Sequence, residues 1–255
     1  MDALNQPLPP IEPAPKPGII SRVYMVFAEP AKLFGTLTGK VDWLVPLIFV
    51  AVIGSVLGYF TMPYIVESQR AGVERMMEKY RDQMPEETYR QTMEQIEEQF
   101  AEAQSYKWYY PLLGVALPFI FFMIIGVVCL ITGNFIFGGK ASFWIVVNVV
   151  AYAALIGLLG DVVRSIMMLA KDSAYVYTGL GLLKPIDDGS FFYYLLKQID
   201  LFSIWRIAVT AVGLGVIYKM KPAKFMYVII PIWIIFICLV AAVDMFSGGS
   251  IGSMI

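Results

Sequence analysis

The chain has 255 residues, of which 58% are hydrophobic and 15% are charged, and its formal net charge is -1. A soluble globular domain has about 45–50% apolar residues, so this composition excludes an ordinary soluble globular protein. The chain has no histidine, and both of its cysteines lie in apolar runs, which removes the usual ligands of a catalytic metal. We therefore expect an integral membrane protein without a metal, a cofactor or a nucleic-acid partner.

The N-terminal part of the chain is too polar to cross a membrane. Residues 1–18 hold six prolines and no basic start leading into an apolar run, so we expect a Pro-rich disordered tail and not a signal peptide. A docking peptide for a partner is the alternative. Residues 19–42 are amphipathic, and we expect one or two short helices in the membrane interface, with their apolar face in the lipid boundary.

Five later stretches are long and apolar enough to span a bilayer, which needs about 20 helical residues. They lie at about residues 44–66, 111–135, 143–165, 201–218 and 225–246. The second stretch could extend to Phe137. We take residues 43–246 as one membrane domain, followed by a tail at 247–255. The predicted fold class is all-α, a polytopic membrane helix bundle with five transmembrane helices.

A charged segment at residues 67–107 separates the first two spans and holds half of the 20 acidic residues. Its apolar residues recur at spacings of three and four on both sides of Pro85. This pattern predicts an inserted acidic helical hairpin that projects from the membrane, with Pro85 in the first turn of the second helix. The charge is typical of a solvated face. Binding of a partner protein through the tail or the hairpin is the alternative.

The remaining connections indicate the direction of the chain. Residues 171–200 alternate aromatic and polar residues with turn signals, so we expect an interfacial connection that is helical at 191–197. Three lysines, Lys219, Lys221 and Lys224, lie between the last two spans and favour a cytoplasmic position for that turn. Five spans then place the N-terminus in the cytoplasm and the C-terminus outside.

Five ionisable residues lie within the spans or at their ends: Asp161, Arg164, Asp200, Arg206 and Asp244. Inserting such a group costs about 2.5–3.5 kcal/mol, so each needs a reason. Alternating topology places all five toward the non-cytoplasmic face, with Arg206 deepest. We expect Arg206 to pair with Asp161 in a polar cluster that locks the bundle or lines a cavity. Snorkelling of the charges nearest the helix ends is one alternative, and a ligand or ion site is another.

Other short motifs carry less information. Gly54 and Gly58 form a GxxxG motif, and we expect it to serve helix packing within the chain, with a dimer contact as the alternative. Asn134 and Asn148 are expected to make hydrogen bonds between helices. The chain has no HExxH and no GxSxG, and the stretch at 86–90 is one residue short of the EExxxR motif of prenyl proteases. We expect no enzyme, and an intramembrane enzyme remains a third functional alternative.

Several short sequence segments resemble those of a known family. They are residues 22–30 with Phe34, residues 43–47, residues 149–153, and residues 200–205 leading into 213–215. Over about residues 20–245 the chain resembles the bacterial branch of the Ypt-interacting protein (Yip-one) domain family. The resemblance implies a five-helix domain with a cytoplasmic N-terminus, in the bacterial cytoplasmic membrane. Eukaryotic relatives act in vesicle trafficking and contact small Ypt/Rab GTPases, and the acidic hairpin looks like an insertion relative to their short loops.

The sequence thus leads to a non-enzymatic organising or adaptor protein that contacts the lipid bilayer and could meet protein partners through its tail or hairpin. The alternative is a small transporter or lipid-handling protein that uses the charged cluster around Arg206. A wet cavity that reaches Arg206 from one side would favour this alternative.

Overall fold

The computed structural model describes residues 17–37, 39–103, 110–184 and 187–247. These residues form helices and no strand, apart from an isolated bridge between Gly179 and Asp200. The α-helices are α1 (Ile19–Ala28), α2 (Pro30–Thr36), α3 (Leu44–Tyr80), α4 (Glu86–Ala103), α5 (Tyr110–Leu130), α6 (Phe143–Lys171), α7 (Phe191–Lys197), α8 (Leu201–Tyr218) and α9 (Pro222–Ser247). Nearly all of the two predicted tails, 1–18 and 247–255, lies outside the described residues.

Five helices are long and apolar enough to cross a membrane, as the sequence predicts. They are α3, α5, α6, α8 and α9. Prolines occur inside α3, α5 and α9, which membrane helices tolerate because neighbouring groups satisfy the freed backbone carbonyls. The predicted extension of the second span to about Phe137 is present as a wider helical turn, η2 (Ile131–Ile136). The polytopic helix bundle is therefore confirmed.

The central helix of the bundle is α6. In the most hydrophobic 18-residue stretch of α6, 67% of the residues are buried, compared with 17% in the corresponding stretch of α9. It packs against α3, α5 and α8, and α8 in turn packs against α9. Close contacts depend on small residues: a Cβ on Gly213 of α8 would lie 2.5 Å from a methyl group of Val149 on α6. The helices α9, α8, α6 and α3 thus follow one another around the bundle.

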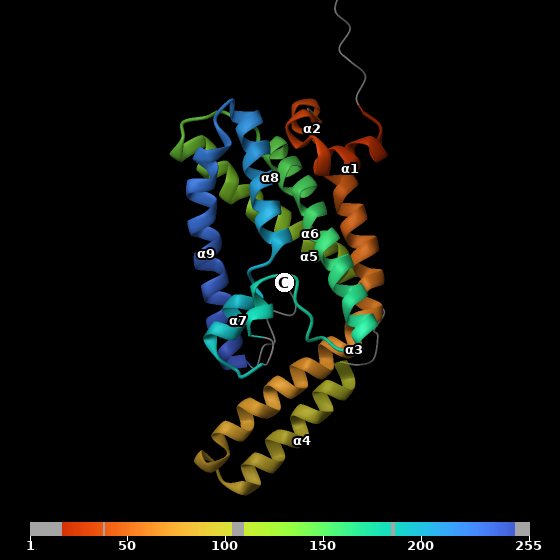
Figure 1. The fold of residues 1–255 in the computed structure, drawn as a ribbon, viewed down its shortest axis with the longest axis vertical. Helices are drawn as coiled ribbons and strands as arrows, with labels where there is room; N and C mark the ends of the chain where they lie inside the picture. The colour runs from red at the N-terminus through yellow and green to blue at the C-terminus, as the bar shows by residue number, and fades with distance from the viewer. Residues whose placement is uncertain (1–16, 38, 104–109, 185–186, 248–255) are drawn as a thin grey trace, which may run out of the picture.

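The projecting hairpin is built differently from the prediction. The sequence placed the end of the first span at about residue 66 and the hairpin at 67–107, but α3 continues without a break from the membrane span to Tyr80. The appearance of charges after Val66 changes the solvent of the helix and does not interrupt its backbone hydrogen bonds. The second arm, α4, begins directly after Pro85 and returns along α3, with Arg70 3.2 Å from Glu97 (Figure 1).

The segment at residues 19–42 also differs from the prediction. Its apolar face does not lie in the lipid boundary, because Val26, Leu33 and Phe34 are buried in the main core. The helix α1 packs against α6, and α2 packs against α8. An ion pair between Arg22 and Asp42, with an Nη1–Oδ1 distance of 3.1 Å, joins α1 to the turn before α3. This face is buried because its side chains join the hydrophobic core that residues of α6 and α8 form.

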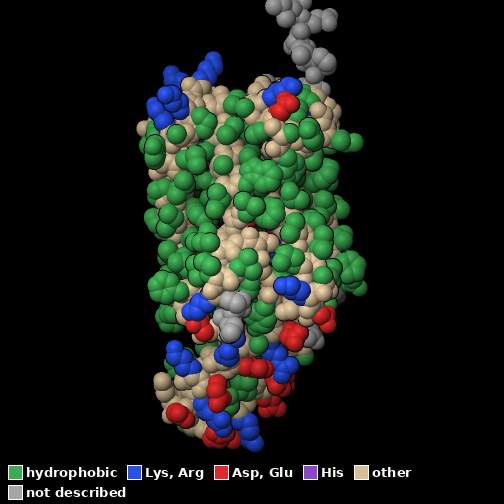
Figure 2. Space-filling model, viewed as in Figure 1, with side chains coloured by type: hydrophobic (Ala, Val, Ile, Leu, Met, Phe, Trp, Pro, Cys, Tyr) green, Lys and Arg blue, Asp and Glu red, His purple; other side chains and the backbone are tan. Residues whose placement is uncertain are grey.

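The two ends of the bundle are chemically different. The helices α1 and α2 and the turn between α8 and α9 lie at one end, and α7 and the hairpin lie at the other (Figure 1). Hydrophobic side chains cover the middle of the face seen in Figure 2, whereas charged side chains collect at its ends. Lys219, Lys221 and Lys224 are exposed at the end that carries α2. This distribution is that of a membrane-spanning protein.

Candidate functional site

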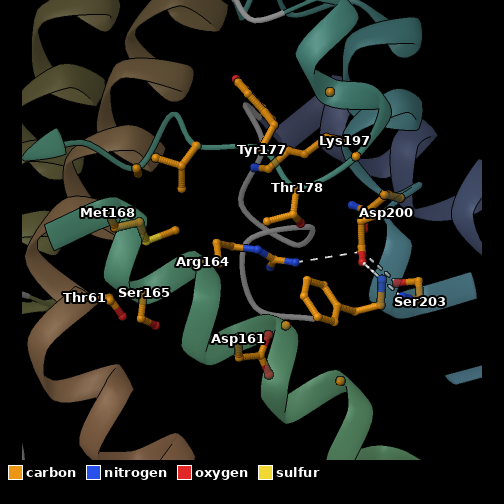
Figure 3. Close-up of a pocket in the computed structure, with 18 of the residues that line it drawn as sticks. Thr61, Asp161, Arg164, Ser165, Met168, Tyr177, Thr178, Lys197, Asp200 and Ser203 are labelled. Atoms are coloured by element: carbon orange, nitrogen blue, oxygen red, sulfur yellow. Dashed lines mark hydrogen bonds and ion pairs between the residues drawn. The ribbon is translucent and has the colours of Figure 1, made fainter. Parts of the chain in front are cut away.

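A polar cavity of about 370 Å³ lies between α3, α6, α8 and α9 in the half of the bundle near the hairpin. The connection between α6 and α8 lines it through residues 174, 176–179 and 181, together with Lys197 and Gln198 (Figure 3). The site contains four of the five charged residues singled out in the sequence: Asp161, Arg164, Asp200 and Arg206. The structure therefore brings these four together around one cavity.

One face of α6 forms the longest wall. The cavity-lining residues of α6 are Gly157, Gly160, Asp161, Arg164, Ser165 and Met168. Their spacing of three and one repeats the turn of an α-helix, so all six lie on one face. A Cβ on Gly160 would lie 2.8 Å from Cγ of Phe202, so the glycine lets α8 approach closely at this level. The wall begins with two glycines toward the centre of the bundle, is polar at Asp161, Arg164 and Ser165, and ends in Met168 toward the hairpin.

Both carboxylate oxygens of Asp200 are engaged by neighbouring groups. Its Oδ1 accepts hydrogen bonds from the backbone N–H groups of Phe202 at 2.7 Å and Ser203 at 3.0 Å, which caps the N-terminus of α8. Its Oδ2 accepts the Ser203 hydroxyl at 2.8 Å and lies 3.9 Å from Nη2 of Arg164 (Figure 3). The carboxylate is buried, and both of its oxygens are already engaged.

Arg206 lies deeper than this pair and has no such partner. Its Nη1 would lie 3.3 Å from a Cβ on Gly157, so the absence of a side chain there makes room for the guanidinium. Its Cζ lies 6.0 Å from the centre of the Phe121 ring, at the outer range of a cation–π contact. Within the described part of the chain, no carboxylate lies within 4.0 Å of its nitrogens and none of its N–H groups donates to a protein acceptor.

The expected pairing of Arg206 with Asp161 is therefore not formed. Asp161 is accessible and lines the cavity, but it makes neither an ion pair nor a hydrogen bond with another described residue. The reason is their different depth. Arg206 lies at the level of Gly157, and Asp161 follows Gly157 by four residues, which is about 6 Å along the axis of α6. The two opposite charges line one cavity and act on each other electrostatically, but they do not form an ion pair within 4.0 Å.

Asp244 is separate from the other four charges. It does not line the cavity and is completely buried on α9, at the contact with α7. Its charge acts on Lys197, which was not singled out in the sequence and which lines the mouth of the cavity. Burial lowers the pKa of Lys197, and the charges of Asp244 and Asp187 oppose that shift.

Gly54 and Gly58 face the cavity and not a neighbouring helix. A Cβ on either glycine would have no heavy atom within 4 Å, apart from the backbone of its own helix. The expectation that they serve helix packing in this chain is therefore wrong. They line the cavity together with Leu57, Thr61, Ile65 and Ser68 of the same helix. The missing side chains of the GxxxG motif leave open space that forms part of the cavity.

Polar contacts join α3 to the connection between α6 and α8, which covers one side of the cavity. The Tyr64 hydroxyl donates to Asp172 at 2.8 Å, and Arg75 in the hairpin contacts Asp187 with an Nη2–Oδ2 distance of 2.6 Å. Nearby, the Lys184 ammonium lies 2.6 Å from Asp188, and this contact lowers the pKa of Asp188 to about 2. The first arm of the hairpin and the cover of the cavity are thus directly connected.

Two tyrosines make a buried hydrogen bond within the connection between α6 and α8. The hydroxyls of Tyr177 and Tyr193 lie 2.9 Å apart, and burial raises the pKa of both. Gly179 lies so close to Ile199 and Asp200 that a Cβ on it would overlap the Ile199 carbonyl oxygen. The backbone N–H of Leu180 donates to that same oxygen at 2.9 Å. Gly179 therefore allows a close approach of two backbone segments.

Sequence reasoning missed several residues of the site. The alternating topology that grouped Asp161 with Asp200 also places Lys197 at the same face, so its charge was a usable signal. Thr61, Thr178 and Ser203 carried no signal, because a single hydroxyl near an apolar run is common. Asn134 and Asn148, expected to link helices, bond instead to backbone carbonyls of Ala141 at 3.1 Å and Gly39 at 2.7 Å.

The cavity is lined by side chains of both charges. Three cationic side chains and two carboxylates line it: Arg164, Lys197, Arg206, Asp161 and Asp200. Among the residues that the structure describes, no three His, Cys, Asp or Glu side chains are arranged to hold a metal ion. Its deep wall adds Trp233, Phe236 and Ile237 of α9. A ligand there would meet both charged side chains and the apolar surface of α9.

Comparison with known families identifies the chain. No curated protein and no solved structure matches it. The family model of the Yip1 domain matches residues 24–243, which extend from α1 into α9. This match covers most of the chain, and the five membrane helices agree with the resemblance seen in the sequence. The chain belongs to the Yip1 domain family.

Proposed function

We propose that this membrane protein binds an anionic group in the cavity and works as a lipid-handling protein or a small transporter, without catalysis. The observation that carries the proposal is the guanidinium of Arg206, which lines the cavity without an ion pair within 4.0 Å or a hydrogen bond to another described residue. A charge at membrane depth costs about 2.5–3.5 kcal/mol on insertion scales, and such residues face a cavity or one another and mark substrate or ion pathways. Arginine also suits the oxygens of a phosphate or carboxylate.

The walls of the cavity favour a ligand with an apolar part. Leu57, Trp233, Phe236 and Ile237 lie on α3 and α9, and these two helices contact each other sparingly. An apolar chain attached to the bound group could therefore extend between α3 and α9 into the bilayer. This arrangement supports lipid handling more directly than transport of a small solute.

The test is ligand-induced stabilisation of the purified full-length protein in detergent. We expect inorganic phosphate or dioctanoyl phosphatidylglycerol to raise the thermal midpoint of the wild type, because a ligand that binds only the folded state stabilises it. Arg206→Gln should abolish the rise, and Arg90→Gln on the exposed face of α4 is the matched control. The proposal is wrong if neither probe stabilises the wild type, or if Arg206→Gln responds as the wild type does.

An organising or adaptor role is the second candidate. It is supported by the hairpin, which projects beyond the bundle and exposes the charged side chains of α4 (Figure 2). Replacement of residues 69–101 by a short flexible linker, compared with the intact chain in affinity capture, tests this role. Capture of the same proteins by both forms would count against the hairpin as an adaptor surface.

We also propose that the N-terminus is cytoplasmic and that the hairpin lies outside, in the cytoplasmic membrane of a bacterium. The exposed lysines between α8 and α9 support this direction. Single cysteines at exposed positions, Lys221→Cys and Glu94→Cys, in a background with Cys129→Ala and Cys238→Ala test it in intact cells. A membrane-impermeant maleimide should label only the α4 position. Labelling of only the α8–α9 position would reverse the orientation.

A further inference from the structure

We infer that the cavity recognises a zwitterionic phosphoethanolamine group, with the phosphate on Arg206 and the primary ammonium on Asp161, as the headgroup of a phosphatidylethanolamine lipid. This inference rests on the proposed function, and it adds a ligand class and a second recognition residue. It follows from the charges that lack a close ion pair in the protein, from their relative depth, and from the direction in which a lipid lies in a bilayer.

The charges of the cavity differ in how closely protein groups engage them. Asp200 caps α8 and lies 3.9 Å from Arg164, so this carboxylate already has close partners. Asp161 and Arg206 make no ion pair or hydrogen bond with any side chain in the described ranges. A ligand that neutralises both must itself carry one negative and one positive charge. A purely anionic ligand would pair with Arg206 and leave Asp161 with only the longer-range charge of Arg164.

The depths of Arg206 and Asp161 match the order of charges in the lipid. Arg206 lies at the level of Gly157, whereas Asp161 is about 6 Å, roughly one helical turn, closer to the hairpin end. In the leaflet on the hairpin side, lipid chains point to the bundle centre and headgroups point to the hairpin. The phosphate then lies deeper than the ammonium, with a two-carbon link between them. Arg206 and Asp161 occur in that same order.

The rest of the cavity follows the same direction. Beyond Arg206 toward the bundle centre, the walls are Gly54, Gly58 and the apolar side chains of α9, which suit the glycerol and the start of the acyl chains. Toward the hairpin, the walls become polar at Ser68 and Lys197. The sparse contact between α3 and α9 leaves a lateral route for the chains. A free phosphoethanolamine molecule would use the charges but not the apolar walls.

The primary ammonium is distinguished from other headgroups by its donors. It presents three N–H groups, and a carboxylate such as Asp161 accepts them. The quaternary ammonium of phosphatidylcholine has no N–H to donate, and phosphatidylglycerol has no positive charge. We therefore expect the order phosphatidylethanolamine, then phosphatidylcholine and phosphatidylglycerol.

The experiment is a thermal-shift titration of the purified full-length protein with dioctanoyl phosphatidylethanolamine, phosphatidylcholine and phosphatidylglycerol, and with free phosphoethanolamine. On the wild type we expect phosphatidylethanolamine to bind about tenfold more tightly than phosphatidylglycerol, the size of one charged hydrogen-bonded contact. Asp161→Asn should remove this preference while binding of phosphatidylglycerol persists. Asp82→Asn, on the exposed turn of the hairpin, is the matched control and should keep the preference.

The outcomes separate the inference from the proposed function. Equal binding of the three lipids to the wild type, or an unchanged preference in Asp161→Asn, overturns the phosphoethanolamine assignment and leaves an anion site at Arg206. Free phosphoethanolamine that binds as tightly as the lipid overturns the lipid source. Absence of binding by every phosphate-bearing probe overturns both. The comparison of lipids on the wild type does not depend on the folding of any variant.

Discussion

Asp200 caps α8 through Phe202 and Ser203 and also lies 3.9 Å from the guanidinium of Arg164 on α6. One carboxylate thus starts a membrane helix and joins it to the central helix of the bundle. This double role keeps Asp200 from reaching Arg206, which lies more than one turn further along α8. Arg206 therefore interacts with Asp200 only over a longer distance.

Removal of the cap should weaken the fold measurably. Asp200→Ala leaves two N–H groups of α8 without their acceptor, and we expect a loss of about 1–2 kcal/mol in the free energy of unfolding. Asp200→Ser keeps a capping oxygen and removes the charge, so most of the stability should remain. Reversible unfolding in mixed detergent measures both. Equal stability of Asp200→Ala and the wild type would show that the cap contributes nothing.

The backbone contact at Gly179 should be intolerant of any side chain. In Gly179→Ala the new methyl group overlaps the Ile199 carbonyl oxygen, and we expect a loss of about 1–3 kcal/mol as the connection shifts away from Asp200. Gly35→Ala in α2 is the control, since a Cβ there meets nothing within 4 Å and alanine favours a helix. Thermal unfolding compares the two. A Gly179→Ala protein as stable as Gly35→Ala would refute the close approach.

The ion pair at the opposite end should hold α1 to the bundle. The side chains of Arg22 and Asp42 are 15% and 13% exposed, so loss of one partner leaves a largely buried charge without its ion pair. We expect Arg22→Met to cost about 3 kcal/mol. The double variant Arg22→Met/Asp42→Asn should recover part of that loss, because no charge is left unpaired. A double variant that is no more stable than the single one would argue against coupling of the pair.

Lys197 should make stability depend on alkaline pH. Burial lowers its pKa in the folded protein below the ordinary 10.5. As pH falls through 10.5, the unfolded chain takes up the proton first, so stability decreases until the lowered pKa is reached. Stability should therefore rise as pH is raised through that window toward 10.5. Lys197→Met should lose this contribution to the slope, as measured by the thermal midpoint at several pH values. An identical slope in both proteins contradicts the assignment.

The sequence predicted the fold more fully than the site. Span positions follow from the cost of charges in lipid, and α7 was expected at 191–197 and occurs there. The continuity of α3 into the hairpin was missed, because hydropathy reports the solvent around a helix and not where its hydrogen bonds end. The docking of α1 and α2 was missed for a related reason. An amphipathic face has the same pattern whether it meets lipid or another helix.

The site depended on details that periodicity does not contain. Alternating topology grouped Asp161, Arg164, Asp200 and Arg206 at one end, and the structure places all four around the cavity. The partners within the group were not predictable, since they depend on the depth of each side chain and on the capping role of Asp200. Gly54 and Gly58 show the same limit: a small-residue motif permits close approach, and only the packing of the other helices decides whether the space is filled.

The central claim is that Arg206 holds a phosphate-bearing ligand, and native mass spectrometry of the protein purified from membranes tests it most directly. We expect the wild type to retain a phospholipid through detergent extraction, and Arg206→Gln to lose it while Arg90→Gln keeps it. Equal retention of the lipid by the wild type and Arg206→Gln, or a wild type without bound lipid or anion, would contradict the account.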